Sequence, residues 1–281
     1  MKRIDIKIIK NCKRLRNAGI SVGDISSKLS ISKSTVHSYV KGIALNHRQN
    51  DIIMQKVKLA RRNKPNPRKG KCLPGREVVK PKSWSSDLVH IVAHYMFDGR
   101  VDNDSCIYYS KDKYQISHMK QLVERMLKAS PKIKLRDNGV YGLVCYNVEL
   151  ANYIQTRKGK VLDYLNNGAS MLEKKTFLRA FFDDEGSVFY KGDKKRVRGY
   201  QKSGLILGYV KNLLSELDIA GRVNKNSTNI EISGRDNLAK FSKEVNFSPR
   251  IYINPNRKNG IWKRRVSKAR ILNLLLDSYQ K

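Results

Sequence analysis

The chain has 281 residues, which is room for two domains of ordinary size. It carries 58 Lys and Arg against 24 Asp and Glu, a formal net charge of +34, and such a field favours a polyanionic partner, above all nucleic acid. The sequence has no apolar run near 20 residues, no amphipathic basic helix and no lipidation signal, which argues against a membrane partner.

The amino-terminal stretch MKRIDIKIIKNCKRLR is basic but has no long apolar segment followed by a cleavage site. The sequence therefore predicts an intracellular protein of the cytoplasm or nucleoid. Its four cysteines, Cys12, Cys72, Cys106 and Cys145, lie far apart and show neither paired nor Cys/His spacing. We interpret them as free thiols, because this spacing indicates neither a zinc site nor a disulfide framework.

Residues 4–42 have the pattern of three short helices. Apolar residues recur at helical spacing up to Gly19, which ends the first helix. Ser21 and Ser32 are expected to cap the second and third helices, with a tight turn at Ser30 between them. The pattern resembles the helix-turn-helix of site-specific recombinases and bacterial regulators, so we expect a DNA-binding domain over residues 1–45.

The first turn of a recognition helix faces base edges, where small polar and basic side chains are useful. The candidate DNA-binding residues of this helix are Lys33, Ser34, Thr35, His37 and Ser38. The alternative is a three-helix bundle that contacts only proteins.

Residues 46–84 are expected to be a basic linker. A helix can continue to about Arg62, but four prolines and eleven Lys or Arg lie between Lys56 and Lys82. Two interpretations are open: a solvated tether, or a tether that follows the phosphate backbone or a minor groove between two DNA-binding parts.

The rest of the chain contains an internal repeat, over residues 85–170 and 171–265. Ala93 and Ala180 are separated by 87 residues, and so are Asp98 and Glu185. Each unit has the pattern of a helix, a hairpin, a helix, a hairpin and a helix. A final helix rich in leucine is expected within residues 266–281.

The stretches LRAFFDDEG (178–186) and IVAHYMFDG (91–99) resemble the signature helix of the LAGLIDADG homing endonucleases. The resemblance covers about residues 84–265. It implies an α+β fold, a duplicated αββαββα saddle with an internal pseudo-two-fold, working as a monomer on double-stranded DNA. Ala93 and Ala180 are small enough to let the two signature helices pack closely.

That packing would bring Asp98 and Glu185 side by side. Two adjacent carboxylates repel each other, and a divalent ion that prefers oxygen ligands relieves the repulsion. The resemblance therefore implies that Asp98 and Glu185 are catalytic and bind Mg²⁺ (or Mn²⁺). The alternative is that the acids are merely polar residues at a helix end, although acids at a carboxyl end oppose the helix dipole.

Basic residues alternate with other residues in two predicted strands, so they share one face of each strand. The expected DNA-binding residues of the saddle are Lys132, Lys134, Arg136, Arg196, Arg198 and Lys202. The alternative is an ordinary solvated sheet face.

The resemblance also implies a catalytic lysine some two dozen residues before the second signature acid, and Lys160 stands 25 residues before Glu185. Arg250 is the nearest match in the second half and a candidate DNA-binding residue. The first signature departs from the family pattern at His94 and Met96, which leaves open an asymmetric or inactive site.

Three functions fit these observations. The first is a metal-dependent, site-specific DNA endonuclease whose helix-turn-helix lengthens the recognised site. The second is a catalytically inactive, DNA-binding transcription regulator descended from such an enzyme. The third is a maturase that binds intron RNA.

Overall fold

A computed structural model describes residues 6–63, 77–192, 194–226, 228–255 and 261–279. The chain divides into two compact units, Met1–Lys69 and Gly70–Lys281, and each is described by itself. Within the described ranges, no helix has both the length and the apolar character needed to cross a membrane.

The first unit is helical, as the sequence predicts. Its helices are α1 (Ile6–Asn17), α2 (Val22–Leu29), α3 (Lys33–Val40) and α4 (His47–Asn63). The Ser21 hydroxyl accepts a hydrogen bond from the Asp24 amide at 3.1 Å, and the Ser32 hydroxyl accepts one from the Thr35 amide at 3.1 Å. These bonds satisfy amides that a helix start leaves without partners. Cys12, Ile25, Val36 and Val40 form the core of this unit.

The second unit contains two repeats with the same order of elements. The first comprises α5 (Ser86–Phe97), β1 (Gly99–Val101), β2 (Ser105–Ser110), α6 (Lys113–Leu127), β3 (Lys132–Leu135), β4 (Tyr141–Tyr146) and α7 (Val148–Asn167). The second comprises α8 (Met171–Glu185), β5 (Gly186–Lys191), β6 (Lys194–Tyr200), α9 (Gly204–Glu216), β7 (Gly221–Val223), β8 (Asn229–Ser233) and α10 (Arg235–Glu244). The α+β architecture and the order within each repeat confirm the prediction.

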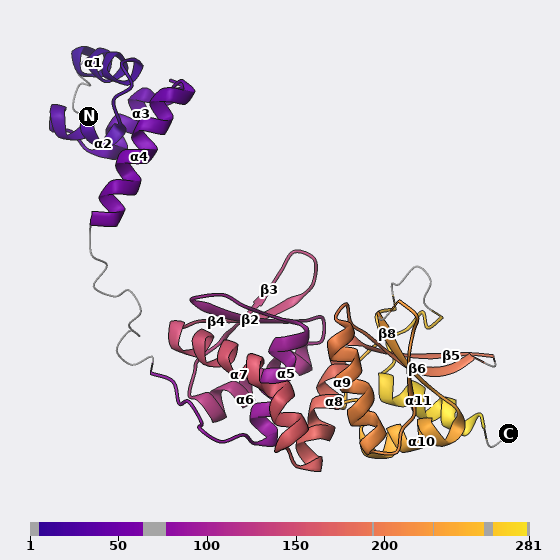
Figure 1. The fold of residues 1–281 in the computed structure, drawn as a ribbon. Helices are drawn as coiled ribbons and strands as arrows, with labels where there is room; N and C mark the ends of the chain where they lie inside the picture. The colour runs from indigo at the N-terminus through magenta and orange to yellow at the C-terminus, as the bar shows by residue number, and fades with distance from the viewer. Residues whose placement is uncertain (1–5, 64–76, 193, 227, 256–260, 280–281) are drawn as a thin grey trace. The chain divides into compact units, whose positions relative to one another are not determined.

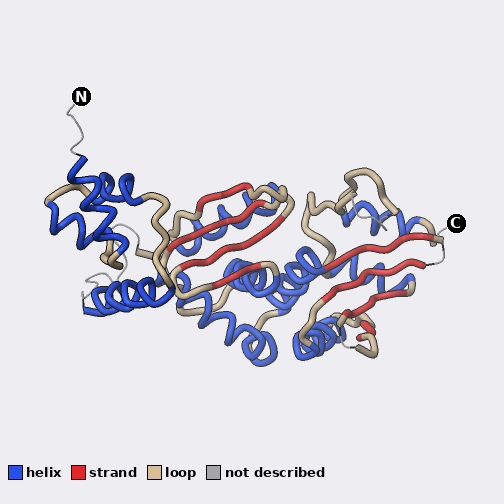
Figure 2. The backbone as a smooth tube through the Cα atoms, turned by 90° about the horizontal axis from the view of Figure 1, so that it is seen from above, coloured by secondary structure: helices blue, strands red, loops and turns tan. Residues whose placement is uncertain are grey.

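Each repeat builds one antiparallel sheet, with strand order β1-β2-β4-β3 in the first and β5-β6-β8-β7 in the second. The sheets lie on one side of the unit and the helices beneath them (Figures 1 and 2). Helices α5 and α8 pack against each other where the repeats meet. Ala93 and Ala180 are fully buried there, and their small side chains let the helix backbones approach.

The two signature glycines make a helix turn directly into a strand. A Cβ atom built on Gly99 would lie 2.5 Å from the Cα atom of Tyr95, and one built on Gly186 would collide with the carbonyl oxygen of Phe182. Only glycine leaves room for such close backbone approach. Asp98 and Glu185, which directly precede these glycines, therefore lie where α5 and α8 end.

Part of the expected linker belongs to the second unit. The Tyr153 hydroxyl donates to the Pro81 carbonyl at 2.8 Å, and Trp84 stacks on Tyr164 with ring centroids 4.9 Å apart. Lys80 forms an ion pair with Glu149 at 2.8 Å. Residues 64–76 of that linker, with Cys72, lie outside the described residues, while Cys12, Cys106 and Cys145 are buried and form no disulfide.

The chain ends with the expected leucine-rich helix, α11 (Lys268–Asp277). Ile271, Leu272 and Leu275 are fully buried against the body. A short bridge between Tyr252 and Ser267 brings the start of α11 back beside α8.

Candidate active site and nucleic-acid interface

A cluster of acids lies where α5 and α8 end. Asp98 caps the carboxyl end of α5, and Glu185 is the last residue of α8. Asp98, Asp183 and Asp184 line a cavity of about 920 Å³, whereas Glu185 is not among its lining residues. The two helices pack together as predicted, and Glu185 acts electrostatically on Asp98.

Burial and mutual repulsion disfavour the charged forms of these acids. Burial first, and then the charges of Asp184 and Glu185, raise the pKa of Asp98 to about 7. Burial and Asp184 likewise raise the pKa of Glu185 to about 7. At neutral pH each of the two acids is therefore poised between its protonated and charged forms, which is the behaviour of carboxylates that lack a compensating cation.

The donor set fits a hard divalent ion. Magnesium typically binds proteins through one or two carboxylates and completes its shell with water and phosphate oxygens. Among the residues with described positions, no three His, Cys, Asp or Glu side chains form a metal-binding group. Asp98 and Glu185 thus provide the minimal set, and a bound phosphate would have to supply further oxygens.

Asp183 faces away from this pair. One of its carboxylate oxygens accepts a hydrogen bond from the Ser248 amide at 2.9 Å, while the other is buried without a partner. Burial raises the pKa of Asp183 to about 6. The three consecutive acids of α8 therefore have different surroundings, which their sequence did not distinguish.

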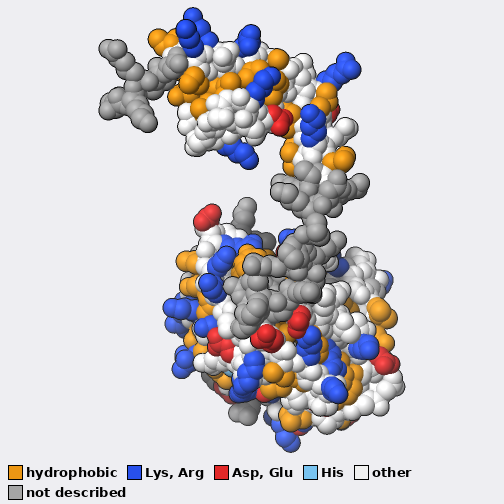
Figure 3. Space-filling view, turned by 90° about the vertical axis from the view of Figure 1, so that its left-hand side faces the viewer, with side chains coloured by type: hydrophobic (Ala, Val, Ile, Leu, Met, Phe, Trp, Pro, Cys, Tyr) orange, Lys and Arg blue, Asp and Glu red, His pale blue; other side chains and the backbone are white. Residues whose placement is uncertain are grey.

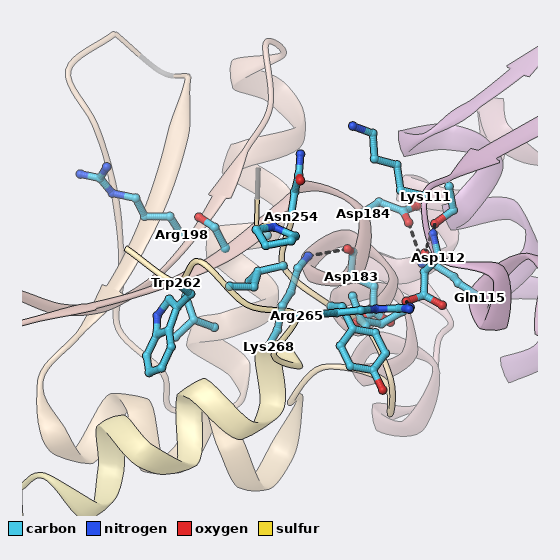
Figure 4. Close-up of a pocket in the computed structure, with 18 of the residues that line it drawn as sticks. Lys111, Asp112, Gln115, Asp183, Asp184, Arg198, Asn254, Trp262, Arg265 and Lys268 are labelled. Carbon is cyan, nitrogen blue, oxygen red and sulfur yellow. Dashed lines mark hydrogen bonds and ion pairs between the residues drawn. The ribbon is translucent and has the colours of Figure 1, made fainter. Parts of the chain in front are cut away.

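Lys268 is the lysine that the structure brings to the acids. Its buried ammonium donates to the carbonyl oxygens of Asp183 at 2.6 Å and Phe182 at 3.2 Å (Figure 4). Its charge lowers the pKa of Asp98 and Glu185, against the larger effect of burial. The ammonium also compensates the negative carboxyl end of α8.

Lys160 lies elsewhere. It is exposed on α7 and is not among the residues that line the cavity. Sequence spacing did not identify Lys268, because this residue follows the second repeat, where a bridge between Tyr252 and Ser267 holds the start of α11 beside α8.

The match to a protein family covers this second signature helix. Residues 173–246 match the family model of the LAGLIDADG-like domain. No curated protein matches the sequence.

Several solved structures are similar to the chain at low identity. Mesophilic variants of the homing endonuclease I-DmoI show 18% identity and a TM-score of 0.48, over 59% of this chain and 93% of theirs. The homing endonuclease I-WcaI bound to its DNA recognition sequence shows 14% and 0.42, over 59% and 89%. Full-length DUF199/WhiA from Thermatoga maritima shows 12% and 0.45, over 63% and 61%.

The sheet of the second repeat carries an acid among its predicted basic residues. Arg196 and Arg198 project from β6, and both pair with Glu231 of β8, at 3.0 and 2.8 Å. These arginines lower the pKa of Glu231 despite its burial. Val197 and Gly199, which alternate with the arginines, face the core. Arg196 and Arg198 therefore share one face of β6, and Glu231 neutralises part of their charge.

The sheet of the first repeat keeps more of its basic residues exposed. Lys132, Lys134 and Arg136 are exposed, and the guanidinium of Arg136 lies 4.4 Å from the ring centre of Tyr109. Lys and Arg side chains are spread over the surface of this end of the second unit, with Asp and Glu among them (Figure 3). Aromatic and cationic groups side by side suit a nucleic-acid surface.

The remaining predicted residues lie on exposed turns and on α3. Lys202 is exposed directly after β6. Arg250 has a left-handed backbone, with φ of 67°, and its guanidinium lies 5.2 Å from the ring centre of Tyr114 in the first repeat. On α3 of the other unit the exposed side chains are Lys33, Ser34, His37 and Ser38, whereas Thr35 is half-buried. The Thr35 hydroxyl bonds the capping hydroxyl of Ser32 at 2.7 Å.

Proposed function

We propose that the protein is a divalent-metal-dependent, site-specific endonuclease of double-stranded DNA, and that Asp98 and Glu185 hold Mg²⁺ or Mn²⁺. One observation carries this proposal: two carboxylates from the ends of adjoining central helices, each with its pKa raised to about 7. A site that gathers negative charge inside a protein of net charge +34 has a role that requires a cation.

Different residues of the chain would have different roles in the reaction. A bound divalent ion supplies a Lewis acid for a phosphodiester and lowers the pKa of a coordinated water. Asp98 and Glu185 hold the ion from opposite repeats, so one copy of the chain suffices. Lys268 fixes the end of α8, and Arg198, which lines the same cavity, can bind a phosphate. Lys160 would need to reach the site from outside the cavity.

DNA binding is proposed to involve both units. The exposed basic residues of the two sheets would follow the phosphate backbone, and α3 would enter a major groove. Joining two binding modules in one chain raises the local concentration of the second once the first is bound. Site specificity would thereby extend beyond the saddle.

A DNA-binding regulator without nuclease activity is the second candidate. The observation in its favour is Lys268, whose buried ammonium already places one positive charge beside the acids without a metal. Such a regulator would bind DNA equally well with and without divalent ions.

Incubation with a library of duplex targets separates these functions. I-DmoI has been crystallised with its target DNA in the presence of Mn, Mg or Ca, which suggests the ions to use. The endonuclease predicts double-strand breaks with Mg²⁺ or Mn²⁺ that are lost in Asp98→Asn and in Glu185→Gln, while an Asp236→Asn control retains cleavage. Asp236 is an exposed acid on α10. Specific binding without strand breaks, unchanged by the two site substitutions, would reject the endonuclease in favour of the regulator.

A further inference from the structure

The contacts between α5 and α8 differ in kind at equivalent positions of the two repeats. Phe97 of α5 packs on Phe177 and Phe181 of α8, with ring centroids 5.4 and 5.2 Å apart. The residue 87 positions after Phe97 is Asp184, and those 87 positions before Phe177 and Phe181 are His90 and His94. Asp184 contacts His94, with the carboxylate oxygen 2.7 Å from Nδ1. One aromatic contact thus has an ionisable pair as its counterpart.

The neighbouring strands are matched to this difference. In β1 and β2, Gly99 pairs with Tyr108, and in β5 and β6, Gly186 pairs with Gly199. A Cβ on Gly199 would collide with the ring of Phe181, so glycine makes room for that ring. Tyr108 fills the equivalent space and donates its hydroxyl to Asp184 at 2.8 Å. Each half therefore has its own set of fitting residues.

Asp184 has a complete set of polar partners. One carboxylate oxygen accepts from the Tyr108 hydroxyl and from the Gln115 amide at 2.9 Å, and the other faces His94. The side chains of Asp184 and His94 are only 1% and 2% exposed. A carboxylate buried this deeply requires hydrogen-bond donors, and Nδ1 of His94 is placed to provide one.

We propose that His94 and Asp184 form a buried, hydrogen-bonded positioning pair that sets how Glu185 approaches Asp98. Asp184 immediately precedes Glu185, and His94 lies one helical turn before Asp98, so the pair joins the last turns of the two helices. The role in positioning rests on the endonuclease function proposed above. The pair itself does not depend on it.

The charges around His94 agree with an imidazolium. From α8 it faces Asp183 and Asp184, from its own helix Asp98 and His90, and from β2 the Tyr108 hydroxyl. Burial lowers the pKa of His94, but Asp184, aided by the more distant Asp183 and Asp98, more than offsets it, so the pKa is raised. His118 of α6 and Arg179 of α8 also act electrostatically on the neighbouring His90.

The hydrogen bonds of His90 and His94 are consistent with a protonated His94. Burial, and then His94, His118 and Arg179, lower the pKa of His90 well below its usual value, so His90 is neutral. Its Nε2 can then accept from Nε2 of His94, 3.1 Å away, while Nδ1 of His94 donates to Asp184. A charged His94 uses both of its donors.

Stability alone does not account for this arrangement. Buried ion pairs are commonly no more stabilising than apolar residues of similar volume, whereas breaking one by removing a partner is costly. The chain has an apolar solution at the equivalent contact of Phe97 with Phe181. A polar pair with fixed geometry restricts rotation and sliding of the helices more than an aromatic contact does, which is what a two-carboxylate site requires.

A double-mutant cycle in urea, without divalent ions, tests the pair. His94→Gln and Asp184→Asn should each lower the folding equilibrium constant by about a hundredfold or more at pH 6. The fold-change in the folding equilibrium constant of the double variant should be smaller than the product of the two single fold-changes. The matched control is the cycle of Phe97→Leu with Phe181→Leu, the equivalent apolar contact, whose coupling should be smaller, because neither substitution leaves a buried polar group without its partner.

Two further measurements cover variants that fail to fold and separate the two proposals. Imidazole ¹⁵N shifts of the wild-type protein should show Nδ1 of His94 protonated, as donation to Asp184 requires. An unprotonated Nδ1, or losses in the cycle that are simply additive in free energy, would overturn the pair. For folded Asp184→Asn, DNA cleavage should fall at least about tenfold while DNA affinity in Ca²⁺ stays within about threefold. If wild-type cleavage occurs and Asp184→Asn retains its rate, the positioning role is wrong. If the wild type does not cleave, the endonuclease function fails while the cycle still decides the pair.

Discussion

Nζ of Lys268 donates to the carbonyl oxygen of Asp183 at 2.6 Å, which ties the first residue of α11 to the last turn of α8. We expect Lys268→Met to lower the free energy of unfolding by about 2 to 4 kcal/mol, since it removes buried charge-assisted hydrogen bonds and a cation beside the acids. Urea unfolding measures this change. Arg270→Met, an exposed change on the same helix, should cost less than about 0.5 kcal/mol. Equal losses in the two variants would show that Lys268 has no special electrostatic role.

Because the pKa of Asp98 is raised, replacing this residue should increase the stability of the protein by an amount that depends on pH. An acid whose folded pKa is raised contributes full stability below its unfolded value near 3.8 and loses it as the pH rises through about 7. In EDTA, Asp98→Asn should therefore be more stable than the wild type at pH 8, by about 1 to 3 kcal/mol, and by less at pH 5. Thermal unfolding at both pH values measures the difference.

Two results would qualify or contradict that expectation. Manganese should reduce the advantage of the variant at pH 8, because an ion held by the acids stabilises the wild type by mass action. A difference between wild type and variant that is independent of pH would mean that Asp98 is not held in a charge-disfavouring environment. Asp236→Asn, on the exposed first turn of α10, serves as the control.

Gly186 is expected to tolerate no side chain. Gly186→Ala should destabilise the protein by about 2 kcal/mol or more, because its Cβ would meet the backbone of Phe182 and force α8 apart from β5. Gly208, inside α9, has open space around its missing Cβ. Gly208→Ala should stabilise by up to about 1 kcal/mol through helix propensity. Opposite signs in urea unfolding would support this account, and a loss in both would contradict it.

Glu231 is expected to weaken DNA binding by occupying two arginines. Glu231→Gln should raise affinity for duplex DNA by about two- to tenfold and steepen its salt dependence, since Arg196 and Arg198 become available for phosphates. Fluorescence anisotropy over a range of salt concentrations measures both quantities. Asp277→Asn, at the exposed end of α11, removes one acid that is not part of the ion pairs of Glu231 and provides the control for net charge. An identical gain in both variants would mean that only the overall charge matters.

The sequence was sufficient to predict the elements of both repeats. Alternation in β6 and the capping serines reflect short-range geometry, whereas the 87-residue spacing from Asp98 to Glu185 reflects the internal repeat, and the two signature helices pack together as expected. Lys268 was missed, since a buried lysine outside the repeat has no spacing signal and depends on a chain return of some 80 residues. His94 was noticed only as a departure from a pattern. Its role became visible when Asp184 was found against it.

The surroundings of acids are likewise a tertiary property. Asp183, Asp184 and Glu185 are adjacent in sequence, yet their side chains face Ser248, His94 and the site of Asp98 respectively. The acid opposite Arg196 and Arg198 came from β8, a pairing that the pattern of β6 alone did not reveal. Sequence periodicity assigns faces to strands, but it does not specify which residue of a neighbouring strand shares the face.

The first unit is expected to extend the recognised site. Deletion of residues 1–69, the whole compact unit, should shorten the DNA footprint and lower affinity by at least about tenfold, because the second binding module is lost. His37→Ala with Lys33→Ala in the full chain should reproduce part of the loss, since both side chains are exposed on α3. The exposed residue Lys28 on α2 provides the control as Lys28→Ala. Footprinting and anisotropy measure these effects. A footprint of unchanged length after the deletion would assign α3 to protein contacts, because a helix that enters a groove protects the bases beneath it.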